Sequence, residues 1–219
     1  MNKKLRIAPE GYSIIALTFF LFILFNVLSF YLDFTLLNLI SNTMFFLFIG
    51  TCFFFRDPIR KISNEHHDFL SPADGTILSV KNYQDSEIGE SKKISIFLSV
   101  LNVHRQCVPL NSKVINTHYN PGTFFGAFLE KASEKNEQTS IYFSDSKNNV
   151  FRIKQIAGFV ARRIVNHMNP NSNVNQGENL GFIKFGSRVE IIVPNNFEIN
   201  VHKGMKVKGC QTVIGRFNK

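Results

Sequence analysis

Hydrophobic and polar positions divide this chain near residue 61. Before that point, two almost wholly apolar runs cover residues 12–31 and 34–55, and Asp33 interrupts them. Each run has about the 20 residues that a membrane-spanning helix needs. The link between them is only a few residues long, so the pattern predicts two antiparallel helices joined by a tight turn. Such a hairpin would either cross a membrane or embed in one leaflet.

Basic residues flank both outer ends of the expected hairpin, and no Lys or Arg lies between the two runs. The positive-inside rule then places both ends, and everything after residue 61, in the cytoplasm. A secretory signal peptide would be shorter and would end in small residues. We therefore expect a membrane anchor over 1–61 and a second domain over 62–219. The flanking residues are Lys3, Lys4, Arg6, Arg56, Arg60 and Lys61.

After residue 68 the pattern changes to short β-like runs separated by turn residues, which predicts a mainly β (α+β) domain. Apolar residues at helical spacing over Thr123–Lys135 predict a short helix or an ordered lid, and the polar stretch Asn166–Glu178 predicts a loop. The expected strands are Thr76–Tyr83, Ile94–Leu101, Lys113–Tyr119, Thr139–Phe143, Val150–Ile156, Phe159–Val165, Val189–Val193 and Thr212–Ile214.

Two glycine-containing segments sharpen the fold prediction. Asp74–Ile77 and Lys203–Gly215 resemble the strand starts of barrel-sandwich folds such as lipoyl domains. No lysine stands on a hairpin suited to a covalent carrier. We expect a barrel-sandwich-like fold and keep a membrane-anchored carrier or adaptor as an alternative function.

The composition of the chain indicates which class of binding partner to expect. The net charge of +9 and the pI of about 9.6 favour an anionic partner. The apolar runs make that partner a membrane surface, because no basic stretch interleaved with aromatics indicates nucleic-acid binding. Three widely spaced cysteines form neither a disulfide framework nor a zinc pattern, so we expect reduced thiols. The histidines and carboxylates lack metal-ligand spacing.

The dipeptide Gly186-Ser187 is the main candidate for chemistry. A turn between strands is its default interpretation, but its residue types also permit self-cleavage. The Ser187 hydroxyl would attack the carbonyl carbon of Gly186, because glycine has no Cβ to obstruct the attack and tolerates strained backbone. Such a reaction needs a base for the hydroxyl and donors for the oxyanion.

Other candidate site residues are spread along the chain. Asp74 lies in a tight turn before a strand, and His104 lies at a strand end. Either could be a base or merely structural. Arg162 and Arg163 interrupt an apolar run and point to opposite faces if the run is a strand. One of them could bind phosphate or carboxylate.

Taken in chain order, these segments resemble one family, phosphatidylserine decarboxylase, in particular its short bacterial and archaeal form. The resemblance runs from Phe55 to the C-terminus. The last of the matching segments is the most specific, because it leaves only a short C-terminal peptide. The segments are Phe55-Arg56-Asp57-Pro58, Ser71-Pro72-Ala73-Asp74-Gly75, Asn102-Val103-His104, Lys131–Glu137, Gly158–Ile164 and Gly181–Val189.

The resemblance implies that the proenzyme cuts itself between Gly186 and Ser187. Residues 1–186 become a β chain, residues 187–219 become an α chain, and the two form a heterodimer that could assemble further. Ser187 becomes a covalent pyruvoyl group. Its ketone forms a Schiff base with phosphatidylserine of an anionic membrane, releasing carbon dioxide and phosphatidylethanolamine. Asp74 matches the aspartate of self-processing, and His104 matches a catalytic histidine.

The chain departs from the longer family members at Lys184-Phe185-Gly186-Ser187, where they have Leu-Gly-Ser-Thr, and at Cys107. They carry a second histidine of a triad where this chain has Cys107. His104, Asp74 or Cys107 could therefore activate Ser187, and we favour His104 with Asp74. A pyruvoyl decarboxylase of soluble amino acids is a rival interpretation, although a soluble substrate gives no reason for an anchor.

Overall fold

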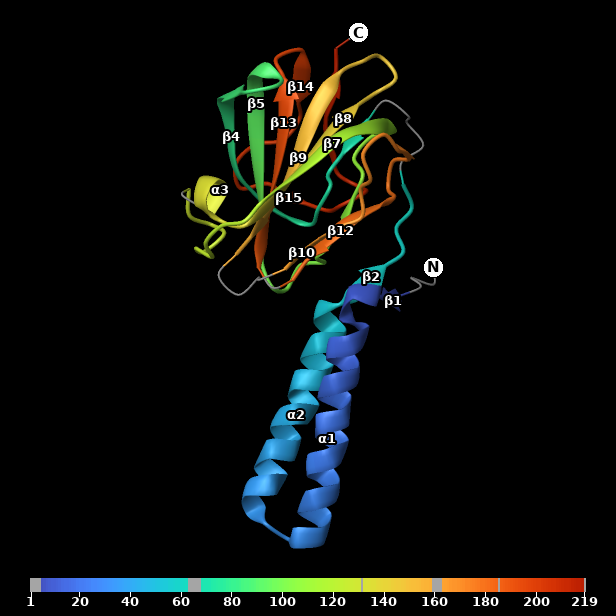
Figure 1. Ribbon diagram of the computed structural model, residues 1–219, viewed down its shortest axis with the longest axis vertical. Helices are drawn as coiled ribbons and strands as arrows, with labels where there is room; N and C mark the ends of the chain where they lie inside the picture. The colour runs from blue at the N-terminus through green and yellow to red at the C-terminus, as the bar shows by residue number, and fades with distance from the viewer. Residues whose placement is uncertain (1–4, 63–67, 131, 159–162, 185, 219) are drawn as a thin grey trace. The chain divides into compact units, whose positions relative to one another are not determined.

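The computed structural model describes residues 5–62, 68–130, 132–158, 163–184 and 186–218 (Figure 1). The chain divides into two compact units, Met1–Ile59 and Arg60–Lys219. The first is a helical hairpin and the second is built mainly from antiparallel strands, so the expected fold class is confirmed.

The hairpin consists of α1 (Tyr12–Leu32) and α2 (Thr35–Phe54). Their rings pack in the pairs Phe19–Phe48 and Phe22–Phe45. Both helices are long and apolar enough to cross a membrane. At the open end, β1 (Leu5–Ile7) pairs with β2 (Arg56–Pro58) next to the short 3-10 turn Pro9–Gly11.

The second unit contains an eight-stranded antiparallel sheet in the order β11-β7-β8-β9-β13-β5-β4-β15, which curls into a half-barrel (Figure 1). Two three-stranded sheets, β10-β12-β6 and β14-β16-β3, complete it. The strands are β3 (Phe69–Leu70), β4 (Gly75–Asp85), β5 (Gly89–Leu98), β6 (Arg105–Cys107), β7 (Ser112–Asn120), β8 (Gln138–Ser144), β9 (Val150–Ala157), β10 (Ile164–Asn166), β11 (Asn173–Val174), β12 (Asn179–Ile183), β13 (Ser187–Pro194), β14 (Phe197–Ile199), β15 (Lys206–Val207) and β16 (Val213–Phe217).

The residues after 186 form strands that pair with strands from earlier in the chain. Strand β13 lies between β9 and β5, β15 pairs with β4, and β16 pairs with β3. Phe69 of β3 packs edge-on against Phe197 and Phe217, with ring centroids 5.3 and 6.3 Å away. The C-terminal segment therefore supplies central parts of the hydrophobic core.

A short helix or an ordered lid is expected over Thr123–Lys135, and the helix is wrong for most of the segment, because among its described residues only α3 (Ala132–Lys135) is helical. The buried side chain of Asn136 explains the difference. Its amide donates to the Phe125 carbonyl at 2.7 Å, and its oxygen accepts the Phe125 N–H at 2.8 Å. These tertiary hydrogen bonds replace the local ones that a helix would make.

Two other sequence-based elements need adjustment. The expected loop Asn166–Glu178 contains the two-residue strand β11, which pairs with β7. Of the expected strand Phe159–Val165, residues 159–162 lie outside the described part of the chain, and β10 covers Ile164–Asn166.

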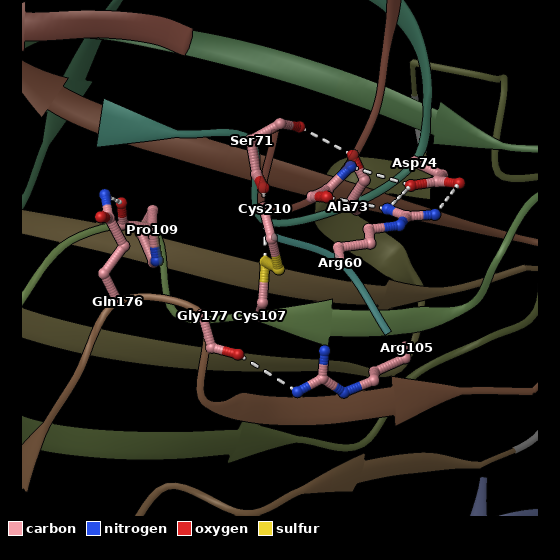
Figure 2. Close-up of a disulfide and its surroundings, with 11 residues drawn as sticks. Arg60, Ser71, Ala73, Asp74, Arg105, Cys107, Pro109, Gln176, Gly177 and Cys210 are labelled. Atoms are coloured by element: carbon pink, nitrogen blue, oxygen red, sulfur yellow. Dashed lines mark hydrogen bonds and ion pairs between the residues drawn. A yellow bond between two sulfur atoms is a disulfide. The ribbon is translucent and has the colours of Figure 1, made fainter. Parts of the chain in front are cut away.

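The expectation of three reduced cysteines is wrong: Cys107 and Cys210 form a disulfide, with Cα atoms 6.3 Å apart (Figure 2). Spacing could not reveal this pair, because 103 residues separate them in the sequence. The fold brings them together through one segment, since Cys107 N–H donates to the Pro72 carbonyl and Cys210 N–H donates to the Ser71 carbonyl, both at 2.9 Å. Cys52 is the free cysteine.

We predict that the protein, purified without reductant and then denatured, exposes one thiol, and that reduction exposes three. The physical reason is that only Cys52 lacks a disulfide partner. Counting alkylations by mass spectrometry measures this, and Cys52→Ser is the control that should leave no thiol before reduction. Three thiols in the unreduced wild type would contradict the pairing.

Candidate active site

Ser187 begins β13 at a position held from both sides. It pairs with Ala157 of β9 and with Leu98 of β5. The residue is fully buried, and its hydroxyl oxygen has no hydrogen-bond partner among the described residues. A buried hydroxyl without a partner lowers the stability of the fold, so its presence here calls for an explanation such as a catalytic role.

Gly186 adopts a left-handed backbone with φ of 67°. The space around a Cβ at this position is open, so it is the backbone conformation that requires glycine here. Gly158 lies against the other side of this peptide, and a Cβ on it would collide with the Gly186 carbonyl oxygen. The carbonyl that precedes Ser187 is thus closely covered by backbone.

His104 reaches the same peptide. Its Nε2 accepts the Gly186 N–H at 3.3 Å, and Nδ1 lies 3.0 Å from the Asn102 carbonyl oxygen. Because Nε2 accepts, we assign the ring proton to Nδ1, which then donates to Asn102. The side chain is fully buried, and the Phe182 ring lies 6.3 Å from it. The neutral tautomer leaves a basic lone pair directed at the Gly186 residue.

Buried amides fix the backbone around His104. Gln106 donates to the His104 carbonyl at 2.6 Å, and Gln155 of β9 donates to Gln106 at 2.8 Å. From the other side, Asn136 donates to the carbonyl of Ala157, the strand partner of Ser187, at 2.7 Å. These hydrogen bonds hold the side chains in one arrangement, although Gln155 Oε1 has no partner among the described residues.

Asp74 is buried, and its carboxylate is directed at Arg60 (Figure 2). It forms a two-pronged ion pair with Arg60, one contact being 2.8 Å, and it accepts the Gly209 N–H at 2.8 Å. Arg60 also donates to the Gly209 carbonyl at 2.8 Å. The structure therefore brings His104 to Gly186, whereas Asp74 contacts Arg60 and Gly209. We call these three residues the Asp74–Arg60 clasp.

The distance between this clasp and Ser187 follows from strand register. Thr76 of β4 pairs with Phe97, and Phe97 pairs with Arg188. Asp74 precedes Thr76 by two residues, so its backbone lies about 10 Å from the start of β13, two strand spacings away. Cys107 of β6 is in the disulfide, and in that form it has no thiol that could act as a base.

The two expected arginines differ in what can be said of them. Arg162 lies outside the described residues. Arg163 is exposed, and its carbonyl accepts the Lys184 N–H at 3.3 Å. Its backbone thus lies beside the segment that leads into Gly186, and its role in binding substrate stays a prediction.

Sequence reasoning missed a buried ionic cluster on the face of β13 opposite Ser187. Arg188 lies 3.4 Å from Glu190, and Glu190 accepts hydrogen bonds from Ser95 at 3.2 Å and Ser133 at 2.9 Å. Burial lowers the pKa of nearby Lys154 to about 8, although the charge of Glu190 opposes this shift. The alternation of charged and apolar residues from Arg188 to Ile191 was the available signal.

No group of three His, Cys, Asp or Glu side chains in the described part of the chain is placed to hold a metal ion. What the site does contain is an unpartnered serine hydroxyl, a neutral histidine at the preceding residue and a glycine in left-handed conformation. These are the elements of a nucleophile and base acting on the backbone itself.

Comparison with known proteins identifies the family of this chain. The sequence model of the family described as phosphatidylserine decarboxylase matches residues 47–215. The chain is 42% identical over 173 residues to a protein of Wolbachia pipientis wMel named phosphatidylserine decarboxylase proenzyme, covering 76% of this chain and 75% of that one. Proteins of the same name from Ehrlichia ruminantium (40%, covering 95% and 89%) and Geotalea uraniireducens (33%, covering 98% of each) are similar over nearly their whole length. The chain therefore belongs to the phosphatidylserine decarboxylase family.

Proposed function

We propose that this protein cleaves itself between Gly186 and Ser187 and then decarboxylates phosphatidylserine to phosphatidylethanolamine. The observation that carries the proposal is the contact between His104 Nε2 and Gly186 N–H, beside the buried hydroxyl of Ser187. Family membership and the names of the relatives support the reaction and its substrate.

The proposed cleavage step uses Ser187, Gly186 and His104. The Ser187 hydroxyl loses its proton to a base and attacks the Gly186 carbonyl carbon, which moves the acyl group from nitrogen to oxygen. Elimination of the ester then leaves a carboxylate on Gly186 and a dehydroalanine at 187. Water converts the dehydroalanine to a pyruvoyl group and ammonia. His104 is the proposed base, because its Nε2 contacts the residue that precedes Ser187.

The pyruvoyl group supplies a ketone that bonds the substrate amine and takes up the electrons left when carbon dioxide departs. The protein holds this group at the start of β13, where Ala157 and Leu98 fix its backbone on both sides. His104 is then available to hold or move a proton beside the reacting carbon. Its burial excludes competing water.

The two product chains are proposed to stay together after the cut. Residues 187–219 provide the central strand β13 and part of the aromatic core around Phe69. The Cys107–Cys210 disulfide also links the two proposed chains covalently, since one cysteine lies on each side of residue 186.

The helical hairpin is the proposed membrane anchor, and the basic residues at its ends favour a catalytic unit on the cytoplasmic side. This location suits a lipid substrate better than a soluble amino acid. The disulfide instead favours an oxidising compartment for the catalytic unit, because the cytoplasm keeps most thiols reduced. In the cytoplasm this pair would exchange with the thiol pool.

We predict that Ser187→Ala abolishes decarboxylation, because the ketone cannot form without the hydroxyl. Release of labelled carbon dioxide from carboxyl-labelled phosphatidylserine, together with formation of phosphatidylethanolamine, measures the activity. Borohydride, which reduces ketones, should inactivate the wild type. Product formation by Ser187→Ala at the wild-type rate would contradict the proposed function.

We predict that His104→Ala slows self-cleavage or turnover by about 100-fold or more, the usual contribution of a positioned base. The reason is the loss of the imidazole whose Nε2 contacts Gly186. The time course of cleavage in freshly synthesised protein, followed on a denaturing gel under reducing conditions, measures the first effect. His118→Ala is the matched control, because His118 lies on β7 beside Asn116. Equal rates in His104→Ala and His118→Ala would remove His104 from the site.

We predict that Asp74→Ala blocks self-cleavage. The comparison with Arg60→Ala tells how, because Arg60 shares the clasp with Asp74 and Gly209. Equal loss in both variants would mean that Asp74 acts by positioning the 209 segment, whereas loss in Asp74→Ala alone would mean that it acts on the reacting groups. Cleavage of Asp74→Ala at the wild-type rate would exclude both roles.

A further inference from the structure

We infer that a cleft over the outer face of β13 binds the phosphodiester of the lipid substrate, with Arg188 as its buried anion contact. This inference rests on the proposed function and names a subsite for it. Two adjoining cavities, of about 310 Å³ and 690 Å³, share the residues Ser79, Lys81, Glu130 and Arg188. We call their union the headgroup cleft.

Arg188 is the deepest cation of the headgroup cleft. Only 4% of its surface is exposed, yet its Nε has no hydrogen-bond partner among the described residues. Its one described ion pair, to Glu190, is long at 3.4 Å. A buried guanidinium with an unused donor is an incomplete anion site, because arginine prefers two parallel hydrogen bonds to a phosphate or carboxylate.

The rim of the headgroup cleft adds positive charge that is available for exchange. Lys81 pairs with Glu130, but both side chains are more than half exposed, so the pair contributes little stability. Lys203 lines the larger cavity, and Lys93 lines the smaller one. An anionic headgroup entering the cleft would displace the weak Lys81–Glu130 pair at small cost.

The larger cavity also has an apolar side. Phe128 is 62% exposed and Leu129 is 37% exposed, and both line it together with Val201. Exposed apolar residues beside cations match a phospholipid, whose phosphate adjoins apolar chains. A soluble phosphorylated metabolite would gain nothing from this apolar wall.

The distance to the reacting group fits this substrate. Arg188 follows Ser187 directly, so their Cα atoms are about 3.8 Å apart. In a serine phospholipid, five bonds of about 1.5 Å join the ketone carbon at position 187 to phosphorus. Because residue 187 begins its strand, a substrate bonded there is able to turn toward the face on which Arg188 lies. The phosphate then falls within reach of the arginine side chain.

The test compares two substrates in mixed micelles of a neutral detergent. One is phosphatidylserine, and the other is O-hexadecyl serine, which has the same amine and carboxylate but no phosphate. Arg188→Gln should raise KM for phosphatidylserine about tenfold or more, the effect of losing a charge-assisted hydrogen bond, and leave KM for the ether unchanged. Arg188→Lys should recover part of the loss. An equal change for both substrates, or no change for either, would overturn the inference.

A second variant is needed, because Arg188 adjoins the proposed cut and its substitution can impair cleavage as well as substrate binding. Lys81→Gln with Lys203→Gln changes the rim alone and should raise KM for phosphatidylserine severalfold, again without effect on the ether. Lys147→Gln, on the turn between β8 and β9, is the matched control that should change neither substrate. If the rim variant behaves like Lys147→Gln, the headgroup cleft is not the phosphate site. If the wild type remains uncleaved, or if it is inactive on both substrates, the proposed function itself fails instead.

Discussion

The pairing of β13 with a strand on each side is the constraint on which the rest of this structure depends. Ser187 is held by Ala157 and Leu98, and the strand continues through a fully buried stretch to Val193. The proposed cut before residue 187 removes only the N–H of that residue, which leaves as ammonia, and keeps the strand pairing of Arg188–Val193. The proposed cleavage site therefore lies at the end of β13, where a change leaves the core intact.

Around that fixed point, the buried polar groups divide into satisfied and unsatisfied ones. Asn136, Gln106 and the Asp74–Arg60 clasp use their hydrogen-bonding capacity to hold backbone in place. The Ser187 hydroxyl, the Arg188 Nε and the Gln155 Oε1 lack partners among the described residues. An unpaired buried polar group costs about 1–3 kcal/mol, and for Ser187 and Arg188 we propose that reactants complete the contacts. Ser187 lies beside the proposed cut, and Arg188 lines the headgroup cleft.

How far the sequence could lead depended on the range of the interactions. The two apolar runs and the alternating strands follow from local periodicity, and the helices end within one residue of the expected 12–31 and 34–55. The family resemblance led to Ser187 and His104. Contacts between distant segments could not be read from the chain. Hydrogen bonds from the Asn136 side chain replace a helix that local spacing favoured. Cys107 lies next to Cys210 because the backbone of each donates a hydrogen bond to residues 71–72. Arg188 looked like one strand residue among others until its burial and its cavities were known.

The mass of the C-terminal fragment tests the central claim most directly. Protein isolated from membranes and denatured under reducing conditions is separated and weighed intact. The account predicts a peptide of residues 187–219 that is lighter than its serine-ended form by one molecule of ammonia, which reports both the cut and the ketone. Recovery of only the full-length chain with an intact Ser187, or of a fragment that begins at another residue, would contradict it.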